Sequence, residues 1–296
     1  MGLLQVNWRA DRLHIAAQSG IAAALAEVPE GRAVTILIHG YRFCPSDPRH
    51  NPHHHILSLT PRAGCWKAVS WPRHLHMGRA DGPFGIAFGW PARGPLRLVA
   101  DRAFDAGRGL GQLIEVIRAV RPDLRLNLMA HSLGARVALA AISASPAHSV
   151  DRAILIAGAE YRDIACQALQ GQSTRVLNIR SAENLPFDIA FRASVPAPHL
   201  GALPLAAGQK NSQTWIDLRI DCARTRADLA ALGHRIKPPA TRFCHWSGYM
   251  RPGLFALYRR VLDPQEGAVL TQLQRISTQP RHRHTSGGDG AQLSPL

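Results

Sequence analysis

The chain has 296 residues, of which 46% are hydrophobic and 19% are charged, a balance that excludes an intrinsically disordered protein and is typical of a globular one. Lysine and arginine together number 35 against 20 acidic residues, which gives a formal net charge of +15. The basic residues form no run of five or more like charges and carry no nucleic-acid-binding signature, so we expect no nucleic-acid partner and at most a weak attraction to an anionic membrane surface.

Apolar runs of strand length alternate with helical patterns along the chain. The β-branched run "AVTILIHG" (33–40) ends in glycine and predicts a buried strand, and similar runs lie at residues 84–90, 124–130, 152–160 and 175–180. The segment 214–220 alternates more regularly, which indicates a strand near a sheet edge. Apolar residues spaced i, i+3, i+4 and i+7 predict helices at 110–117 and 254–261, and an alanine-rich helix is expected at 133–142.

This alternation predicts a single α/β domain over residues 1–276. Strands that are buried on both sides and separated by helices form a doubly wound, mostly parallel sheet covered by helices on both faces. Two irregular segments, 42–83 and 193–212, interrupt the pattern, and we expect both to roof a site. The composition of residues 277–296 predicts a disordered C-terminal tail.

The stretch "LMAHSLGARVALAAI" (128–142) places Ser132 where a predicted strand meets a predicted helix. In an open parallel sheet, ligands bind where the strands end and the connections to helices begin. A tight turn there would lift the serine side chain out of the sheet and bring strand and helix close together, so Ala130 and Gly134 must be small. The helix would also direct free N–H groups at the site, among them that of Leu133. We therefore predict that Ser132 is the nucleophile of a strand–turn–helix elbow and that Leu133 is an oxyanion-hole donor.

These residues resemble the α/β-hydrolase superfamily. "AHSLGA" (130–135) follows one predicted strand and "ILIHGY" (36–41) ends an earlier one, as in lipase- and esterase-like members whose elbow has alanine in place of the first glycine of G-x-S-x-G. "GWPARG" (89–94) and "HWSGYMRPG" (245–253) resemble stretches in a poorly characterised subgroup of these hydrolases, and the similarity in order covers residues 33–262. The resemblance implies an α/β-hydrolase fold, a triad in the chain order serine, acid, histidine, and Tyr41 as the second oxyanion-hole donor.

By this resemblance, the triad acid should follow the strand 175–180. "SAENLPFD" (181–188) offers Glu183, which lies three residues past the strand and is preferred, and Asp188, which lies further out. Asp163 is a third alternative, and each of these carboxylates could instead be a surface charge or a charge at a helix N-terminus.

The base should lie on a late loop of the chain. His245 stands among aromatic residues directly before the last predicted amphipathic helix, where the superfamily has its histidine. His234 follows a helical segment that ends at a capping glycine, and His199 is a third candidate. His131, beside the serine, is expected to pack rather than to take protons.

The sequence predicts neither a cofactor nor a metal site. No glycine motif for phosphates or dinucleotides occurs, and the five cysteines are scattered without a C-x-x-C pair. The histidine-rich stretch "HNPHHH" (50–55) has no carboxylate or cysteine at ligand spacing. The first twenty residues lack the apolar stretch of a secretory signal, and no run of 18 apolar residues occurs, so we expect a cytoplasmic protein. Nothing in the sequence predicts an oligomeric state.

The function that follows is a serine hydrolase acting on carboxylic esters, with lipid esters among the options. Ser132, His245 and Glu183 form the expected triad, Tyr41 and Leu133 form the oxyanion hole, and the partner is a small-molecule ester. Two alternatives stay open at this point: an acyltransferase or thioesterase that uses the same triad, and a non-catalytic scaffold that binds a ligand or an acidic partner.

Overall fold

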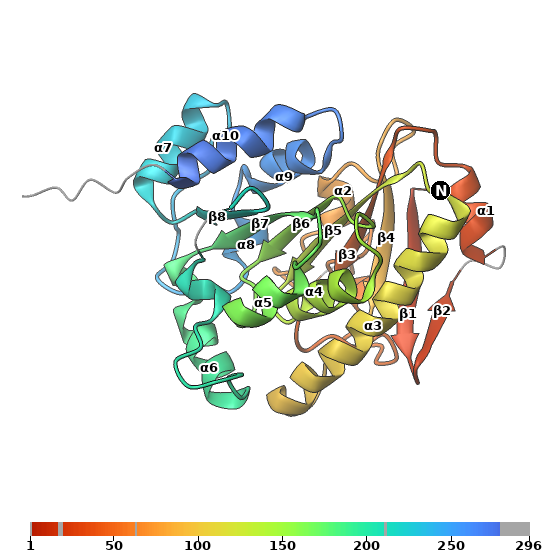
Figure 1. Ribbon diagram of the computed structural model, residues 1–296, viewed down its shortest axis with the longest axis horizontal. Coiled ribbons are helices and arrows are strands. Elements are labelled where there is room, and N and C mark those ends of the chain that lie inside the picture. The colour runs from red at the N-terminus through yellow and green to blue at the C-terminus, as the bar shows by residue number, and fades with distance from the viewer. Residues whose placement is uncertain (1, 17–19, 63, 210–211, 279–296) are drawn as a thin grey trace, which may run out of the picture.

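The computed structural model describes residues 2–16, 20–62, 64–209 and 212–278, and its centre is a single sheet (Figure 1). Within these residues the sheet has eight strands in the order β2-β1-β4-β3-β5-β6-β7-β8, and all neighbours pair in parallel except β1 with β2. The strands are β1 (Leu3–Arg9), β2 (Arg12–Ile15), β3 (Ala33–Ile38), β4 (Phe84–Gly89), β5 (Arg125–His131), β6 (Arg152–Ile156), β7 (Arg175–Arg180) and β8 (Trp215–Arg219). The predicted fold class is confirmed: a doubly wound, mostly parallel α/β sheet, as the α/β-hydrolase resemblance implied.

Alternate residues of the central strands pack into two separate cores. In β3, Ile36 and Ile38 face one hydrophobic cluster and Leu37 faces the other. The first cluster lies under α1 (Gly20–Ala26), α3 (Leu96–Val120), α4 (Gly134–Ala144) and α5 (Arg162–Ala168). The second lies under α2 (Trp71–His74), α7 (Ala223–Ala231), α8 (Ser247–Met250), α9 (Leu254–Leu262) and α10 (Gly267–Thr278). Burial on both faces explains why the central strands read as continuous apolar runs.

The strand register brings the carboxyl ends of three central strands, β3, β5 and β6, to the same level at one end of the sheet. Ile38, the last residue of β3, pairs with Ala130, and His131, the last residue of β5, pairs with Ile156 at the end of β6. The predicted turn at Ser132 therefore leaves the sheet beside the end of β3, as the binding rule for parallel sheets requires.

The two N-terminal strands were not predicted from the sequence. In β1, buried and partly exposed residues alternate, so that Leu4, Val6 and Trp8 face the core while polar residues lie between them. This half-buried pattern is weaker than the continuous runs of the central strands. The prediction for 214–220 is confirmed, because β8 forms an edge of the sheet.

The irregular segments contain little regular structure. Segment 42–83 holds a short 3-10 helix, Pro52–His54, and α2, whereas segment 193–212 holds the 3-10 helix Leu205–Ala207. The first two residues of the predicted tail 277–296 end α10 (Gly267–Thr278) instead, and residues 279–296 lie outside the described residues. None of the helices formed by the described residues, the 25-residue α3 included, is long and apolar enough to cross a membrane.

Candidate active site

Ser132 occupies a strained turn between β5 and α4. Its φ of +56° lies in the left-handed region, which residues other than glycine rarely adopt. Backbone hydrogen bonds hold this conformation: the N–H of Ser132 donates to the carbonyl of Ile156 at 2.9 Å, and its carbonyl accepts from Ala135 at 2.9 Å and Ala159 at 3.1 Å. Strain of this kind persists where the surrounding structure enforces it, often at functional sites. The backbone therefore has the geometry expected of a nucleophile elbow.

Close backbone approach explains the glycines around this turn. A Cβ added to Gly134 would lie 2.6 Å from the carbonyl oxygen of His39 and 2.8 Å from that of Ile38. A Cβ on Gly40 would lie 2.7 Å from the carbonyl oxygen of His131. Neither position has room for a larger residue, which agrees with the steric argument made from the sequence for Gly134.

Two backbone N–H groups are free at the site. Within the described residues, the N–H groups of Leu133 and Tyr41 have no hydrogen-bond acceptor. The Tyr41 group is oriented by His39, whose Nε2 accepts from the N–H of Trp90 at 3.0 Å and whose Nδ1 therefore donates to the carbonyl of Gly40 at 2.9 Å. Because the described chain has no cis peptide bond, the N–H of Tyr41 points away from that carbonyl. Burial lowers the pKa of His39 to about 3, so this residue stays neutral and keeps its orienting role.

His245 lies in the loop before α8 and is enclosed by rings. Phe187 stacks on it with centroids 4.4 Å apart, and the ring of His131 lies 4.5 Å away. His131 packs as expected, and its Nε2 also donates to the backbone carbonyl of His245 at 3.0 Å. Burial, followed by the nearby charges of His131 and Lys67, lowers the pKa of His245 well below its usual value. The imidazole is therefore neutral near pH 7 and available as a base.

The side chain that orients His245 is Asn184. The Nδ2 group of Asn184 donates to Asp188 Oδ1 at 2.6 Å, so its Oδ1 faces His245 and accepts from Nδ1 at 2.5 Å. This arrangement puts the hydrogen of the neutral ring on Nδ1 and leaves the lone pair on Nε2. Burial raises the pKa of Asp188 from 3.8 to about 7, while the hydrogen bond from Asn184 opposes the shift. Asn184 was not predicted from the sequence, since an amide carries no charge to mark it as a triad member.

Glu183, the preferred acid, has partners other than the expected His245. Its carboxylate accepts from Ser181 Oγ at 2.7 Å and pairs with Arg251, and its hydrogen bonds among the described residues do not include His245. A 3-10 turn over residues 182–184 directs Glu183 and Asn184 to different partners. The second choice of acid, Asp188, reaches His245 only through Asn184.

The remaining candidates lie away from the site. Asp163, at the start of α5, pairs with His199 at 3.1 Å, and both are exposed. His234 follows α7 and Gly233, which has the left-handed φ of +86° that the capping interpretation requires, and its ring contacts Arg260. None of these three candidates lines the cavity described next.

One cavity of about 590 Å³ connects these parts. Ser132 and His245 both line it, together with Tyr41, Leu133 and Asn184. The first irregular segment contributes Arg42, Phe43, Arg49, His50, His55, Cys65 and Lys67 to its wall. Helix α6 (Leu185–Ser194) contributes Phe187, Asp188, Ala190 and Phe191. No described residue of segment 193–212 lines the cavity, so the expectation that this segment roofs the site was wrong. It packs instead beside the end of β6, where Leu205 donates to the carbonyl of Glu160 at 2.8 Å.

Histidines of the histidine-rich stretch form hydrogen bonds with residues both near and distant in the chain. His53 is buried and its Nε2 lies 2.7 Å from Asn7 Oδ1, and His55 Nε2 lies 3.1 Å from Cys65 Sγ. Burial lowers the pKa of His53 to about 4. Among the described residues, no group of three or more His, Cys, Asp or Glu side chains is arranged to hold a metal ion.

Comparisons with known proteins give distant structural similarity. No family model matches the sequence, and no curated protein matches it. Among solved structures the chain is similar to a cutinase from Trichoderma reesei in complex with a phosphonate inhibitor, with 14% identity, a TM-score of 0.28 and coverage of 48% of this chain and 61% of the cutinase. It is also similar to the phospholipase PlaB from Legionella pneumophila in complex with thio-NAD, with 12% identity, a TM-score of 0.43 and coverage of 83% and 62%. The chain thus spans less than two thirds of the length of either protein.

Proposed function

We propose that this protein is a serine hydrolase that cleaves carboxylic esters through an acyl-enzyme intermediate. One observation carries the proposal: Ser132 on its left-handed turn and His245, held by Asn184, line the same cavity. The free N–H groups of Leu133 and Tyr41 support it, because an acyl-transfer reaction needs donors where negative charge develops.

In the proposed reaction, Ser132 Oγ attacks the ester carbonyl carbon while His245 Nε2 takes the hydroxyl proton. The carbonyl π electrons move to oxygen, and the resulting oxyanion accepts hydrogen bonds from Leu133 and Tyr41. Collapse of this intermediate breaks the ester C–O bond, and the imidazolium returns the proton to the departing alcohol. Water then attacks the acyl-enzyme with the same base, releasing the carboxylic acid and regenerating Ser132.

Asn184 and Asp188 fulfil the orienting role in this proposal. Asn184 keeps Nδ1 protonated and Nε2 basic, and its carbonyl oxygen stabilises the positive charge that forms on His245. The amide donates in turn to Asp188 Oδ1, and this carboxyl group polarises it more strongly in the fraction of molecules in which Asp188 is ionised. A neutral residue thus stands where a triad normally has a carboxylate, and the carboxylate acts through it.

The test is the variant Ser132→Ala, assayed with p-nitrophenyl butyrate. We expect turnover to fall to the uncatalysed background while the circular dichroism spectrum stays native, because the substitution removes only the attacking oxygen. A fluorophosphonate probe should label the wild type and not the variant. Equal turnover by the two proteins would refute the proposal. A different result is that the probe labels the protein but product forms only when an alcohol or thiol acceptor is supplied. That result would assign acyl transfer instead of hydrolysis.

A further inference from the structure

The proposed active-site cavity is lined by unpaired positive charges. Arg42, Arg49 and Lys67 all line it, and none of the three forms an ion pair with a carboxylate of the described residues. Asp188 is the only carboxyl group that the described residues place on its wall, and its pKa is raised to about 7, so its charge is incomplete near neutrality. The cavity therefore has a net positive wall facing the proposed nucleophile.

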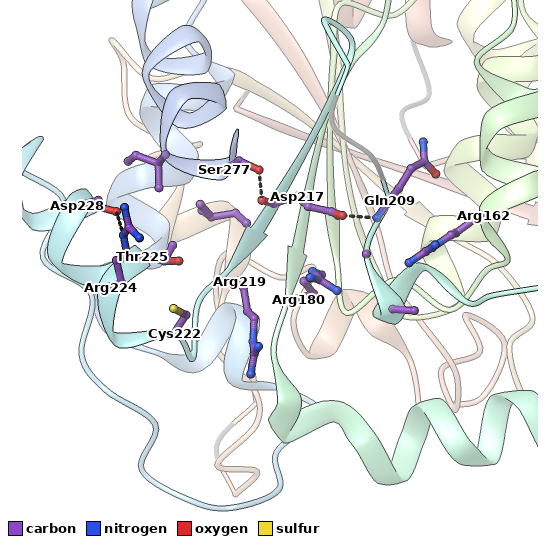
Figure 2. Close-up of a pocket in the computed structure, with 14 residues that line it drawn as sticks. Arg162, Arg180, Gln209, Asp217, Arg219, Cys222, Arg224, Thr225, Asp228 and Ser277 are labelled. Atoms are coloured by element: carbon purple, nitrogen blue, oxygen red, sulfur yellow. Dashed lines mark hydrogen bonds and ion pairs between the residues drawn. The ribbon is translucent and has the colours of Figure 1, made fainter. Parts of the chain in front are cut away.

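The other large cavities of the described residues mix both signs. Figure 2 shows the one beside β7 and β8, of about 440 Å³, where Asp217 and Asp228 lie among the arginines and Asp228 pairs with Arg224. The cavity of about 570 Å³ between α9 and the start of β3 has both charges on its wall: Arg32, Arg259 and Arg260, with Glu30, Asp81 and Asp263. The cavity beside β7 and β8 also has more arginines than carboxylates, so what distinguishes the Ser132 cavity is that Asp188 is the sole carboxyl group that the described residues place on its wall.

Local structure holds two of these cations near the reacting groups. Arg42 directly follows Tyr41, the proposed oxyanion donor, and has a left-handed φ of +76° that its N–H stabilises by donating to Ala92 at 2.7 Å. Lys67 Nζ lies 3.5 Å from the ring centroid of Trp246, the residue after the proposed base. Arg42 Cζ lies 5.9 Å from the ring centroid of Tyr41, so one cation lies beside the residue of the proposed oxyanion donor and the other beside the neighbour of the proposed base.

A smaller cavity adjoins the first at Arg42. It has a volume of about 280 Å³, shares Tyr41, Arg42 and His50 with the main cavity, and adds Arg93. Arg93 and His50 both contact Asp47, which leaves Arg42 as the cation without a carboxylate partner. This recess could receive a compact charged group beside the ester, while the aromatic and aliphatic side chains of the main cavity contact an acyl chain.

We infer that the substrates of this site are esters that carry an oxyanionic group, a phosphate or a carboxylate, which Arg42, Arg49 and Lys67 bind while Ser132 attacks the ester carbonyl. This inference rests on the proposed function and names its substrate class. Arginine is suited to such groups because its planar guanidinium matches their geometry in a bidentate contact. The anionic group can belong either to the alcohol part or to the acyl part of the ester, and the same three cations would bind it in both cases. The test therefore includes one pair of substrates for each part of the ester.

The experiment compares matched esters that differ only in charge. Butyrylglycerol phosphate against butyrylglycerol tests a phosphate on the alcohol, and mono-p-nitrophenyl adipate against its methyl ester tests a carboxylate on the acyl chain. Exposed ion pairs change binding by about two- to fivefold each, so three together predict a wild-type preference of about tenfold or more in kcat/KM for at least one anionic ester. The triple variant Arg42→Gln, Arg49→Gln, Lys67→Gln should reduce that preference to about twofold or less.

The matched control is Arg275→Gln on α10. This exposed arginine has no described ion-pair partner and does not line the cavity, so its loss changes the net charge without changing the site. It should retain the wild-type preference. A wild type without preference for either anionic ester, or a triple variant that retains the preference, would overturn the inference.

Failure of the proposed function is distinguishable from failure of this inference. If neither ester of either pair is hydrolysed, the reaction assignment fails, and calorimetric binding of glycerol phosphate to Ser132→Ala then tests the cations by themselves. The three substitutions should weaken that binding by about tenfold or more. Binding that the substitutions leave unchanged, or that is absent from the start, would overturn the cationic subsite.

Discussion

The role of Asn184 can be tested by replacing it with leucine. The side chain is 4% exposed, and leucine has a similar volume without the amide, so Asn184→Leu removes both hydrogen bonds of this side chain with little change in packing. In the proposed reaction, the bond to His245 becomes charge-assisted when the imidazolium forms. Such bonds contribute about 1.5–3 kcal/mol, and because each 1.4 kcal/mol corresponds to about tenfold in rate, kcat should fall by about 10- to 150-fold.

The assay measures kcat and KM for p-nitrophenyl butyrate, with the concentration of folded enzyme determined by thermal unfolding and circular dichroism. KM should change much less than kcat, since Asn184 orients the base and does not contact the substrate. Asn127→Leu is the matched control: Asn127 is also buried and donates to the carbonyl of Leu262 at 2.9 Å, but it lies near the opposite end of β5. It should cost stability and leave kcat per folded molecule near the wild-type value.

Two results would refute this reasoning. A natively folded Asn184→Leu protein whose kcat stays within about threefold of the wild type would show that His245 needs no partner at Nδ1. An equal loss of kcat in Asn127→Leu would show that the effect comes from general destabilisation and not from the orientation of the imidazole.

Three further outcomes follow from the same structure. Burial raises the pKa of Asp188 from 3.8 to about 7, so the folded state binds a proton more tightly than the unfolded state. The free energy of unfolding of the wild type, relative to that of Asp188→Asn, should therefore fall as pH rises between these two values. Urea unfolding of both proteins across this pH range measures the difference, and a difference that stays constant would contradict the prediction. Glu183→Gln leaves the buried Arg251 without its carboxylate, so we expect the free energy of unfolding in urea to fall by about 3–5 kcal/mol. The kcat per folded molecule should stay within about threefold of the wild-type value. A selective loss of kcat would instead make Glu183 a member of the triad. Gly134→Ala places a Cβ 2.6 Å from the carbonyl oxygen of His39 and should cost about 1–3 kcal/mol, and an unchanged Tm would show that the backbone can shift freely there.

The position of Ser132 and the fold class were predictable because they depend on local patterns. Continuous apolar runs mark strands buried on both faces, and the small residues around the serine reflect the close approach of strand and helix at a turn. Both signals come from residues within a few positions of one another, and the structure has the serine at φ +56° between β5 and α4. Strand β1 and the edge strand β2 were missed because their residues alternate between more and less exposed positions and form no continuous apolar run.

The partner of His245 was decided by tertiary structure. Glu183 and Asn184 are adjacent in a 3-10 turn, and nothing local distinguishes which of them reaches the imidazole. The choice depends on Arg251, which lies near in space but 68 positions along the chain and pairs with the glutamate, leaving the asparagine to His245.

The sequence by itself therefore determined the sheet, the turn and the serine upon it, since contacts between near neighbours in the chain produce them. Only the folded chain decided which side chains surround that serine: the orienting amide, and the arginines and lysine of a segment some 65 to 90 positions earlier. Long-range packing brings these groups to one cavity, and a charge is neutralised or left unpaired there according to neighbours that are distant in sequence.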